Sequence, residues 1–478
     1  MESQPKEEKL TMPKYFKHKI EICKQKFKTY FLNNLQNLPY MKQTIINLAM
    51  NSNLQPELIR PTAWKIFLKT LTFDNINNNN STLKHWLEET YEKRNEFKKK
   101  LSQYKEEIEA AKKESQSNIS NYEENSGIMH LIEIDVERTY GDIKLFQDKF
   151  IRKIEEEILY LFAKENKPIL YKQGMNEILA IFIHCFFPFY FPVSKKLKDK
   201  KDFDLWNKDP NKYINEIYEY FHDEDEFQSD LYYLLYNVMK LGLNKFYDDS
   251  VEPESPKDDP KTYLLIRCDN ILLKLKKHNN KLYQHFMEIQ LSSEIILQRW
   301  LKCIFTREFT TEDCIIIWDN ILANEFNLPS KNLEYIDYFC VAMYDYVSDK
   351  LIELDQNECF LCLFKYPPFQ TIDILIQRAE LVKNNIIKLD APKESLFSNL
   401  KSKFKDTISN INVGSIFNRN KNDNGQKKED ILNELKNLPD NRARIRQLKS
   451  ILSKYRNKFY DDDKMKIDMI LNTLEKSV

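Results

Sequence analysis

The sequence predicts an all-α fold, and three observations support this prediction. Only 6 of the 478 residues are glycine, whereas β-hairpins and phosphate-binding loops need glycine for positive φ angles or close backbone approach. Apolar residues recur at helical spacing, for example at positions 151, 154, 158, 161 and 162. No convincing alternation of apolar and polar residues flanks an Asn-Gly or Asp-Gly turn. The chain should therefore form many helices around a shared core.

Composition and charge exclude several classes of protein. Hydrophobic residues make up 42% of the chain, which is ample for a sizeable core. The 73 basic and 73 acidic residues balance, so nothing global favours nucleic acid as a partner. No apolar run approaches the ~18 residues of a transmembrane helix, and no signal peptide is evident. The 8 scattered cysteines fit reduced thiols in a cytoplasmic protein, and no metal site is expected.

Shifts in composition divide the chain into an arm, a large domain and a tail. Two stretches inside the large domain, 115–127 and 194–210, are polar and are expected to be loops. The predicted segments are a basic helical arm at 1–54, the domain at 55–368 with a charged insertion at 73–127, an additional helix at 369–390, a linker at 391–430 and a helical tail at 431–478.

The first candidate motif is Ile132-x-x-Asp135-x-x-Arg138-Thr139. On a helix, residues three apart lie on one face, so Asp135 can orient the guanidinium of Arg138. The motif alone is weak evidence for a functional site, because a buried isoleucine beside a surface ion pair would show the same residue spacing.

The second candidate motif is Tyr171-x-Gln173-Gly174-Met175-Asn176-Glu177, about 35 residues further along the chain. It follows Pro168, which cannot continue the preceding helix, and it stands where a new helix begins. Loops on a rigid scaffold commonly present functional groups, so Gln173 can point outward while Tyr171 packs beside it. This motif is also weak by itself.

Together and in this order, the two motifs resemble the two fingers of the TBC-domain Rab GTPase-activating proteins. Further blocks in the right order resemble signatures of the same family. These signature residues are Arg60 and Trp64, Arg299 and Trp300, Arg307 and Glu308, and Trp318 and Asp319. No glycine-rich phosphate loop is present, so an intrinsic GTPase or a kinase is disfavoured.

The resemblance implies an all-α TBC domain of two helical subdomains that stimulates GTP hydrolysis by a Rab small GTPase. Arg138 and Gln173 would be the catalytic pair, and the partner would carry the GTP and Mg²⁺, so the chain would have no cofactor of its own. The remaining motif residues would support this pair: Asp135, Tyr171, Ile132, Thr139 and Gly174. Among the signature residues, the tryptophans should lie in the core, and the charged residues should form structural ion pairs.

Within the family, the chain resembles the retromer-associated subfamily, TBC domain family member five. This implies regulation of vesicle and endosomal trafficking, with retromer or an endosomal membrane complex as a further partner. The expected location is cytoplasmic and peripheral to endosomal or other vesicle membranes. One departure is that residues 87–131 contain no proline, whereas the subfamily has an Asn-Pro-Leu-Ser stretch there. Two alternatives stay open: a catalytically weak TBC scaffold acting as a trafficking adaptor, and a helical scaffold with chance motifs.

Overall fold

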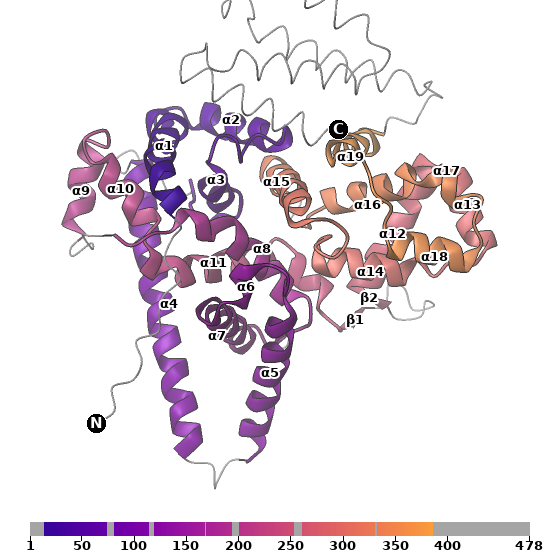
Figure 1. Ribbon diagram of the computed structural model, residues 1–478, viewed down its shortest axis with the longest axis horizontal. Helices are drawn as coiled ribbons and strands as arrows, with labels where there is room; N and C mark the ends of the chain where they lie inside the picture. Colours follow the sequence, from indigo (N-terminus) through magenta and orange to yellow (C-terminus); the bar gives the residue numbers. More distant parts are fainter. Residues whose placement is uncertain are drawn as a thin grey trace, which may run out of the picture. The chain divides into compact units, whose positions relative to one another are not determined.

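Most of the described backbone is helical and only two short strands interrupt the helices, which confirms the predicted fold class (Figure 1). The computed structural model describes seven backbone segments: residues 14–73, 81–113, 119–167, 169–193, 200–252, 261–329 and 332–385. Side chains are described in all of these segments except at 14–18, 108–113, 119–126 and 252. The predicted linker at 391–430 and the predicted helical tail at 431–478 lie outside the described residues.

The N-terminal part of the described chain consists of α-helices and short 3₁₀ helices. They are α1 (Lys14–Tyr30), η1 (Leu32–Asn34), α2 (Leu38–Met50), α3 (Arg60–Phe67), α4 (Thr82–Lys113), α5 (Ile119–Arg138), α6 (Lys144–Gln147), α7 (Lys149–Glu165), α8 (Met175–Phe186), η2 (Phe187–Phe189), α9 (Lys201–Lys208), α10 (Ile214–Phe221), η3 (Glu224–Glu226), α11 (Phe227–Lys240) and η4 (Leu243–Phe246). The helices of the predicted arm share the core, because α1 packs against α10 and α2 against α15, with Phe27 and Ile45 buried.

The C-terminal part begins with two short strands and continues as helices. They are β1 (Val251–Glu252), β2 (Lys261–Thr262), α12 (Tyr263–His278), α13 (Asn280–Glu288), α14 (Ser293–Cys303), α15 (Thr311–Asn327), α16 (Tyr335–Tyr346), α17 (Ser348–Leu351), α18 (Gln356–Phe364) and α19 (Asp373–Lys383). The strands pair antiparallel, with Val251 opposite Thr262. Strands of two residues are too short to produce a sequence alternation, so the sequence did not predict them.

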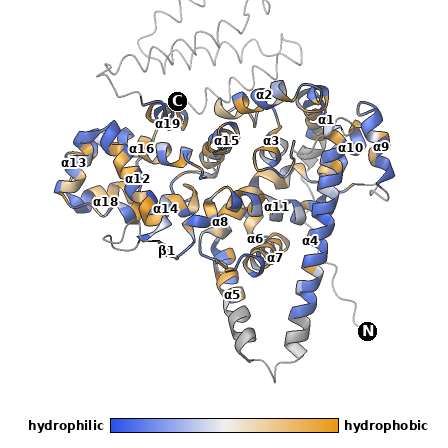
Figure 2. Cartoon of the chain, turned by 180° about the vertical axis from the view of Figure 1, so that it is seen from behind, coloured by the Kyte–Doolittle hydropathy of each residue, from blue (hydrophilic) through white to orange (hydrophobic). Residues whose placement is uncertain are grey.

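Two predicted loops are wrong in part. Within 194–210, residues Lys201–Lys208 form α9, because Phe203 and Trp206 are buried against the ring of Tyr220. Tertiary burial therefore outweighs the polar composition of this stretch. Within 115–127, the backbone is already helical from Ile119, and a single glycine inside a helix costs only about 1 kcal/mol. By contrast, α4 is hydrophilic along most of its length, as its charge density predicts (Figure 2).

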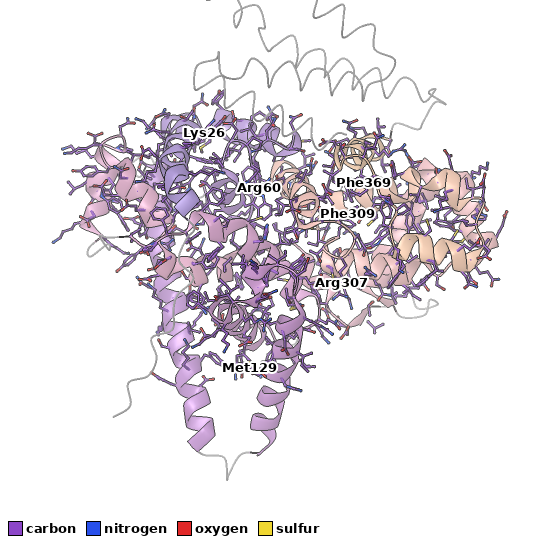
Figure 3. The ribbon with its side chains drawn as sticks, viewed as in Figure 1. Lys26, Arg60, Met129, Arg307, Phe309 and Phe369 are labelled. Atoms are coloured by element: carbon purple, nitrogen blue, oxygen red, sulfur yellow. The ribbon has the colours of Figure 1, made fainter. Side chains whose placement is uncertain are left out.

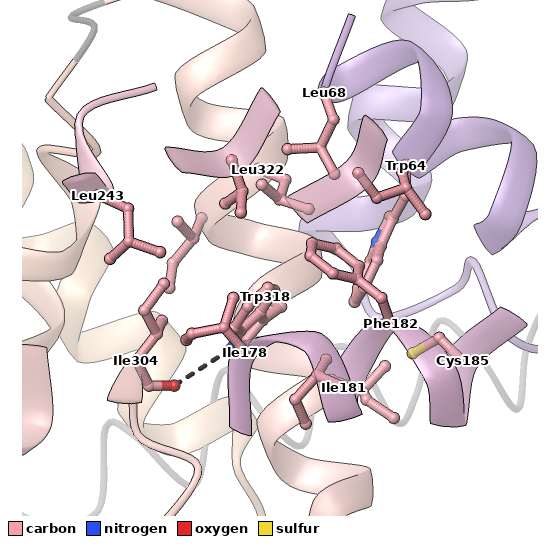
Figure 4. Close-up of a cluster of buried hydrophobic side chains, with 14 of the residues drawn as sticks. Trp64, Leu68, Ile178, Ile181, Phe182, Cys185, Leu243, Ile304, Trp318 and Leu322 are labelled. Carbon is pink, nitrogen blue, oxygen red and sulfur yellow. Dashed lines mark hydrogen bonds between the residues drawn. The ribbon is translucent and has the colours of Figure 1, made fainter. Parts of the chain in front are cut away.

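Helix α8 forms the centre of the core. Every residue in it is buried except Glu177 and His184, and it contacts α3, α5, α7, α11, α14 and α15. Phe182 of α8 lies edge-on to both Trp64 and Trp318, whose rings stack 6.0 Å apart (Figure 4). The indole of Trp318 also donates to the Ile304 carbonyl at 3.1 Å. A helix enclosed on all sides gives a fixed position to the loop that precedes it.

A buried carboxylate joins α3 to α15. Arg60 donates to Asp319 through Nε and Nη2, at 2.9 and 2.8 Å, and the Trp64 indole donates to the same carboxylate at 2.7 Å. Asp319 has no exposed surface, and a buried charge is tolerated only when it is paired and hydrogen-bonded. Removing one partner of such a pair costs ~3–5 kcal/mol, because the other charge stays buried. Arg60 is labelled in Figure 3.

A second buried charge cluster surrounds His222. Asp230 accepts hydrogen bonds from Lys65 and from Arg94, which links α11 to α3 and α4. His222 is 3% exposed, and its Nδ1 lies 2.8 Å from the Tyr218 carbonyl. Burial, together with the charge of Lys65, lowers the pKa of His222 to about 3. The imidazole is therefore neutral in the folded protein at neutral pH.

Acidification should destabilise the fold through His222. Its pKa lies near the ordinary 6.5 in the unfolded chain and at about 3 in the fold, so the unfolded chain binds the extra proton between these values. This contribution to stability is complete above pH 6.5 and falls as the pH drops, by up to ~1.4 kcal/mol per pH unit. Urea unfolding of the wild type and of His222→Gln between pH 5 and 8 measures it. Equal pH slopes for the two proteins would contradict this prediction.

Candidate functional site

The last turns of α5 carry the first candidate motif. Ile132 is fully buried, Asp135 is 5% exposed, and Arg138 is the final residue of the helix, with 55% of its side chain exposed. The backbone takes a positive φ of 42° at Tyr140, just beyond the end of the helix. The motif therefore runs from the core to the surface, and it presents the guanidinium at a helix end.

The carboxylate of Asp135 joins the two candidate motifs. One oxygen pairs with the guanidinium of Arg138, and the other accepts a 2.6 Å hydrogen bond from the Tyr171 hydroxyl. Burial and the bond to Asp135 raise the pKa of Tyr171 above its usual value, so the phenol stays a donor. Asp135 thus orients Arg138 and anchors the loop that bears Tyr171.

The loop between α7 and α8 presents Gln173. Tyr171 is buried, and the neighbouring Gln173 is exposed. Across the part of the chain that the structure describes, no side-chain hydrogen bond to Gln173 is formed. Gly174 has φ +105°, and an added Cβ there would lie 3.4 Å from the Cys303 sulfur and 3.5 Å from the Tyr247 hydroxyl. These distances are ordinary contacts, so the positive φ is the reason that glycine suits this position, and the backbone turn sets the direction of Gln173.

Asn176 is a supporting residue to which the sequence motifs gave no role. Its amide nitrogen donates to Thr139 Oγ1 at 2.8 Å, and its amide oxygen accepts from the Gly174 backbone at 3.0 Å. Thr139 in turn donates to the Asp135 carbonyl at 2.8 Å. One buried amide thereby bridges the end of α5 and the glutamine loop. The available signal was a polar residue at the start of an otherwise apolar helix.

Glu177 is a further supporting residue to which the sequence analysis gave no role, and it connects the start of α8 to the C-terminal helices. It accepts from Arg307 at 2.6 Å and from the Thr306 hydroxyl. Arg307, labelled in Figure 3, lies in the connection between α14 and α15. The guanidinium of Arg299 pairs with Glu308 at 2.7 Å, while burial raises the pKa of Glu308 to about 7. The charged signature residues are thus all paired.

The three signature tryptophans lie in the core. Trp64 and Trp300 have no exposed surface, and Trp318 is 1% exposed. Their rings are therefore part of the core and present almost no surface to a partner. The two exposed side chains of the motifs, Arg138 and Gln173, are the ones presented to solvent.

The arrangement offers a fixed cation and an amide to an external ligand. A guanidinium is a cation with a planar fork of donors, and an amide both donates and accepts hydrogen bonds. Among the described residues, no group of His, Cys, Asp or Glu is placed to hold a metal ion. None of the described helices is long and apolar enough to cross a membrane.

Comparison with known proteins shows which family the chain matches. The matching family model is described as Rab-GTPase-TBC domain and covers residues 57–352. The chain is 26% identical to TBC1 domain family member 5 of Mus musculus, with 71% of this chain and 42% of the relative covered. It is 27% identical to the GTPase-activating protein GYP1 of Saccharomyces cerevisiae, with 41% and 27% covered.

A solved structure shares the fold. The Ypt/Rab-GAP domain of Gyp1p superposes with a TM-score of 0.53 at 22% sequence identity, over 76% of this chain and 98% of that chain. The chain spans about two fifths of the length of the murine relative. The comparisons therefore cover the helical domain and leave the rest of that relative unmatched.

Replacing Asn176 by alanine should loosen the glutamine loop. The Thr139 hydroxyl and the Gly174 amide would lose their partner inside the core, at a cost of ~1–3 kcal/mol. Hydrogen exchange should then accelerate at the Gly174 amide. Asn320→Ala is the matched control, because the amide of Asn320 donates only within its own helix, to the Ile316 carbonyl. If both variants accelerate exchange at Gly174 equally, the bridge does not hold the loop.

Proposed function

Because this chain belongs to the Rab-GTPase-TBC domain family, we propose that it stimulates GTP hydrolysis on a Rab small GTPase through Arg138 and Gln173. One observation carries the proposal. These two side chains are exposed, and both are anchored to the same buried network of Asp135, Tyr171 and Asn176. Such a network lets two groups from separate elements act on one ligand at a fixed relative position.

Arg138 supplies positive charge to the phosphoryl group in transfer. Phosphoryl transfer needs positioning and charge neutralisation more than covalent chemistry, and an arginine supplied in trans contributes ~10³–10⁵ in rate. The planar guanidinium matches phosphate oxygens with a rigid fork of donors. Its pairing with Asp135 limits the orientations it samples, which lowers the entropy lost on engaging the GTPase.

Gln173 positions the attacking water. The amide accepts a hydrogen bond from the water through its oxygen and donates hydrogen bonds through its nitrogen, so it can hold the water in line with the γ-phosphorus. The resemblance implies that Gln173 takes over this task from the glutamine of the GTPase. The left-handed Gly174 and the buried Tyr171 on either side keep the loop in the presenting conformation.

The partner GTPase carries the GTP, the Mg²⁺ and the phosphate loop in this proposal, and the chain has no cofactor of its own. Regulation of vesicle and endosomal trafficking, at a cytoplasmic site peripheral to endosomal or other vesicle membranes, is part of the same proposal. Its support is the similarity to a protein named TBC1 domain family member 5. Retromer or an endosomal membrane complex remains a proposed further partner on the same ground.

A trafficking adaptor is the alternative function. Such a scaffold would bind a Rab without accelerating hydrolysis, and it would have no use for two anchored and exposed side chains. The presence of both Arg138 and Gln173, with their supports, favours stimulation over binding alone.

Arg138→Ala and Gln173→Ala should each abolish most of the stimulation. We expect a loss of ~10³–10⁵ for the arginine variant and ~10²–10³ for the glutamine variant. Arg138→Lys should not restore the rate, because lysine is a point charge without the fork. Single-turnover phosphate release against a panel of GTP-loaded Rabs gives the rates.

The exposed Lys144 on α6 provides a matched control, and Lys144→Ala should keep the wild-type rate. Thermal unfolding should be unchanged in Gln173→Ala and Lys144→Ala, because these side chains are exposed. Arg138→Ala leaves the buried Asp135 carboxylate without its cation, so a modest drop in its unfolding temperature is expected. Wild-type rates for Arg138→Ala or Gln173→Ala would refute the mechanism. Binding of a Rab by the wild type without any acceleration would support the adaptor instead.

A further inference from the structure

The exposed face of α5 continues beyond Arg138 toward the other end of the helix. Leu131 is 56% exposed and Ile134 is 44% exposed. Positions 131, 134 and 138 are spaced by three and four residues, so they form one stripe along the helix. Two aliphatic side chains therefore lie on the same exposed stripe as the proposed catalytic arginine.

The core does not need these two side chains. The opposite face of α5 already anchors the helix through the fully buried Ile132 and Val136. Met129, labelled in Figure 3, packs against the core from the same helix. Single exposed aliphatic residues are common on protein surfaces and need no explanation. Leu131 and Ile134 differ from such single residues because they lie on the same helix face as the guanidinium of Arg138.

Helix geometry fixes the distance of each side chain from the reaction. With a rise of ~1.5 Å per residue, Ile134 lies ~6 Å and Leu131 ~10 Å along the axis from Arg138. A GTPase that receives the guanidinium at its γ-phosphate has to lie against this side of the helix. Its contact surface extends well beyond ~10 Å, since a specific interface buries ~800 Å² on each partner.

We propose that Leu131 and Ile134 form a docking stripe that binds an apolar patch on the GTPase beside its nucleotide site. The proposal rests on the proposed function, because Arg138 must enter that site for the stripe to face it. Glu133 and Glu137 are also exposed on α5, and both lie on one side of the stripe. An apolar centre with a charged rim is the usual composition of such an interface.

The stripe should affect binding more than chemistry. Contacts at Leu131 and Ile134 lie away from the phosphoryl group, so they are equally strong in the bound complex and in the transition state. Removing such uniform contacts raises the concentration needed for half-saturation and leaves the maximal rate unchanged. Loss of two half-exposed aliphatic side chains corresponds to a weakening of about tenfold.

The test is the double variant Leu131→Ala/Ile134→Ala in the full chain. Single-turnover hydrolysis by the Rab that the wild type stimulates best is measured against the concentration of this protein. The half-saturating concentration should rise about tenfold, and the maximal rate should stay within about twofold. The matched control is Leu205→Ala/Leu273→Ala, which removes leucines that are 52% and 50% exposed on α9 and α12 and should change neither quantity.

Direct binding separates failure of the stripe from failure of the proposed function. Wild type and variants are titrated with the same Rabs loaded with a non-hydrolysable GTP analogue. If the wild type binds without stimulating hydrolysis, the proposed function fails, and a tenfold weaker affinity of the double variant still supports the stripe. If no Rab binds, both ideas fail.

Two results would overturn the stripe while the proposed function stands. The first is an unchanged half-saturating concentration and an unchanged maximal rate. The second is a lower maximal rate at an unchanged half-saturating concentration, which would mean that Leu131 and Ile134 support Arg138. Light scattering of the free wild type and the free double variant tests whether something other than a GTPase binds the stripe. If the double variant alters the oligomeric state or the compactness of the chain, then a second copy or residues 386–478 cover the stripe instead.

Discussion

The near-complete enclosure of α8 is the constraint on which the rest of the structure depends. Its neighbours come from both ends of the described chain, α3 on one side and α14 and α15 on the other. A helix held in this way cannot slide or rotate without disturbing packing everywhere around it. The backbone of the residues just before α8 is fixed by this packing, so Gln173 is exposed while its backbone position is restricted. The rigid core thereby limits the positions that the exposed Gln173 side chain can take.

Buried polar side chains add direction to this packing. Asp319 fixes α3 against α15, Asp230 fixes α4 against α11, and Asp135 with Asn176 fixes α5 against the glutamine loop. Apolar contacts between helices tolerate small shifts, whereas a buried carboxylate tolerates only the arrangement that satisfies its oxygens. The same physical device therefore holds both the scaffold and the proposed catalytic pair.

The sequence predicted the features that local rules determine. Few glycines and helical periodicity gave the fold class, and Pro168 with Gly174 located the break between α7 and α8. The role of Asn176 depends on contacts with residues about 40 positions away, which no spacing rule encodes. Helix α9 was missed for a similar reason, since its two aromatic residues become informative only once Tyr91 and Tyr220 lie beside them. Long-range contacts decided what local patterns left open.

The pairing of Arg60 with Asp319 also has a consequence for folding during synthesis on the ribosome. The two residues are 259 positions apart, so Arg60 is synthesised well before Asp319 and cannot form this ion pair until Asp319 has been added. At ~5–20 residues per second, a ribosome takes ~10–50 s to cover that distance. During this interval the faces of α3 and α8 that α15 later covers have no native partner. The packing around α3 and α8 can therefore be completed only after the residues of α15 have left the exit tunnel.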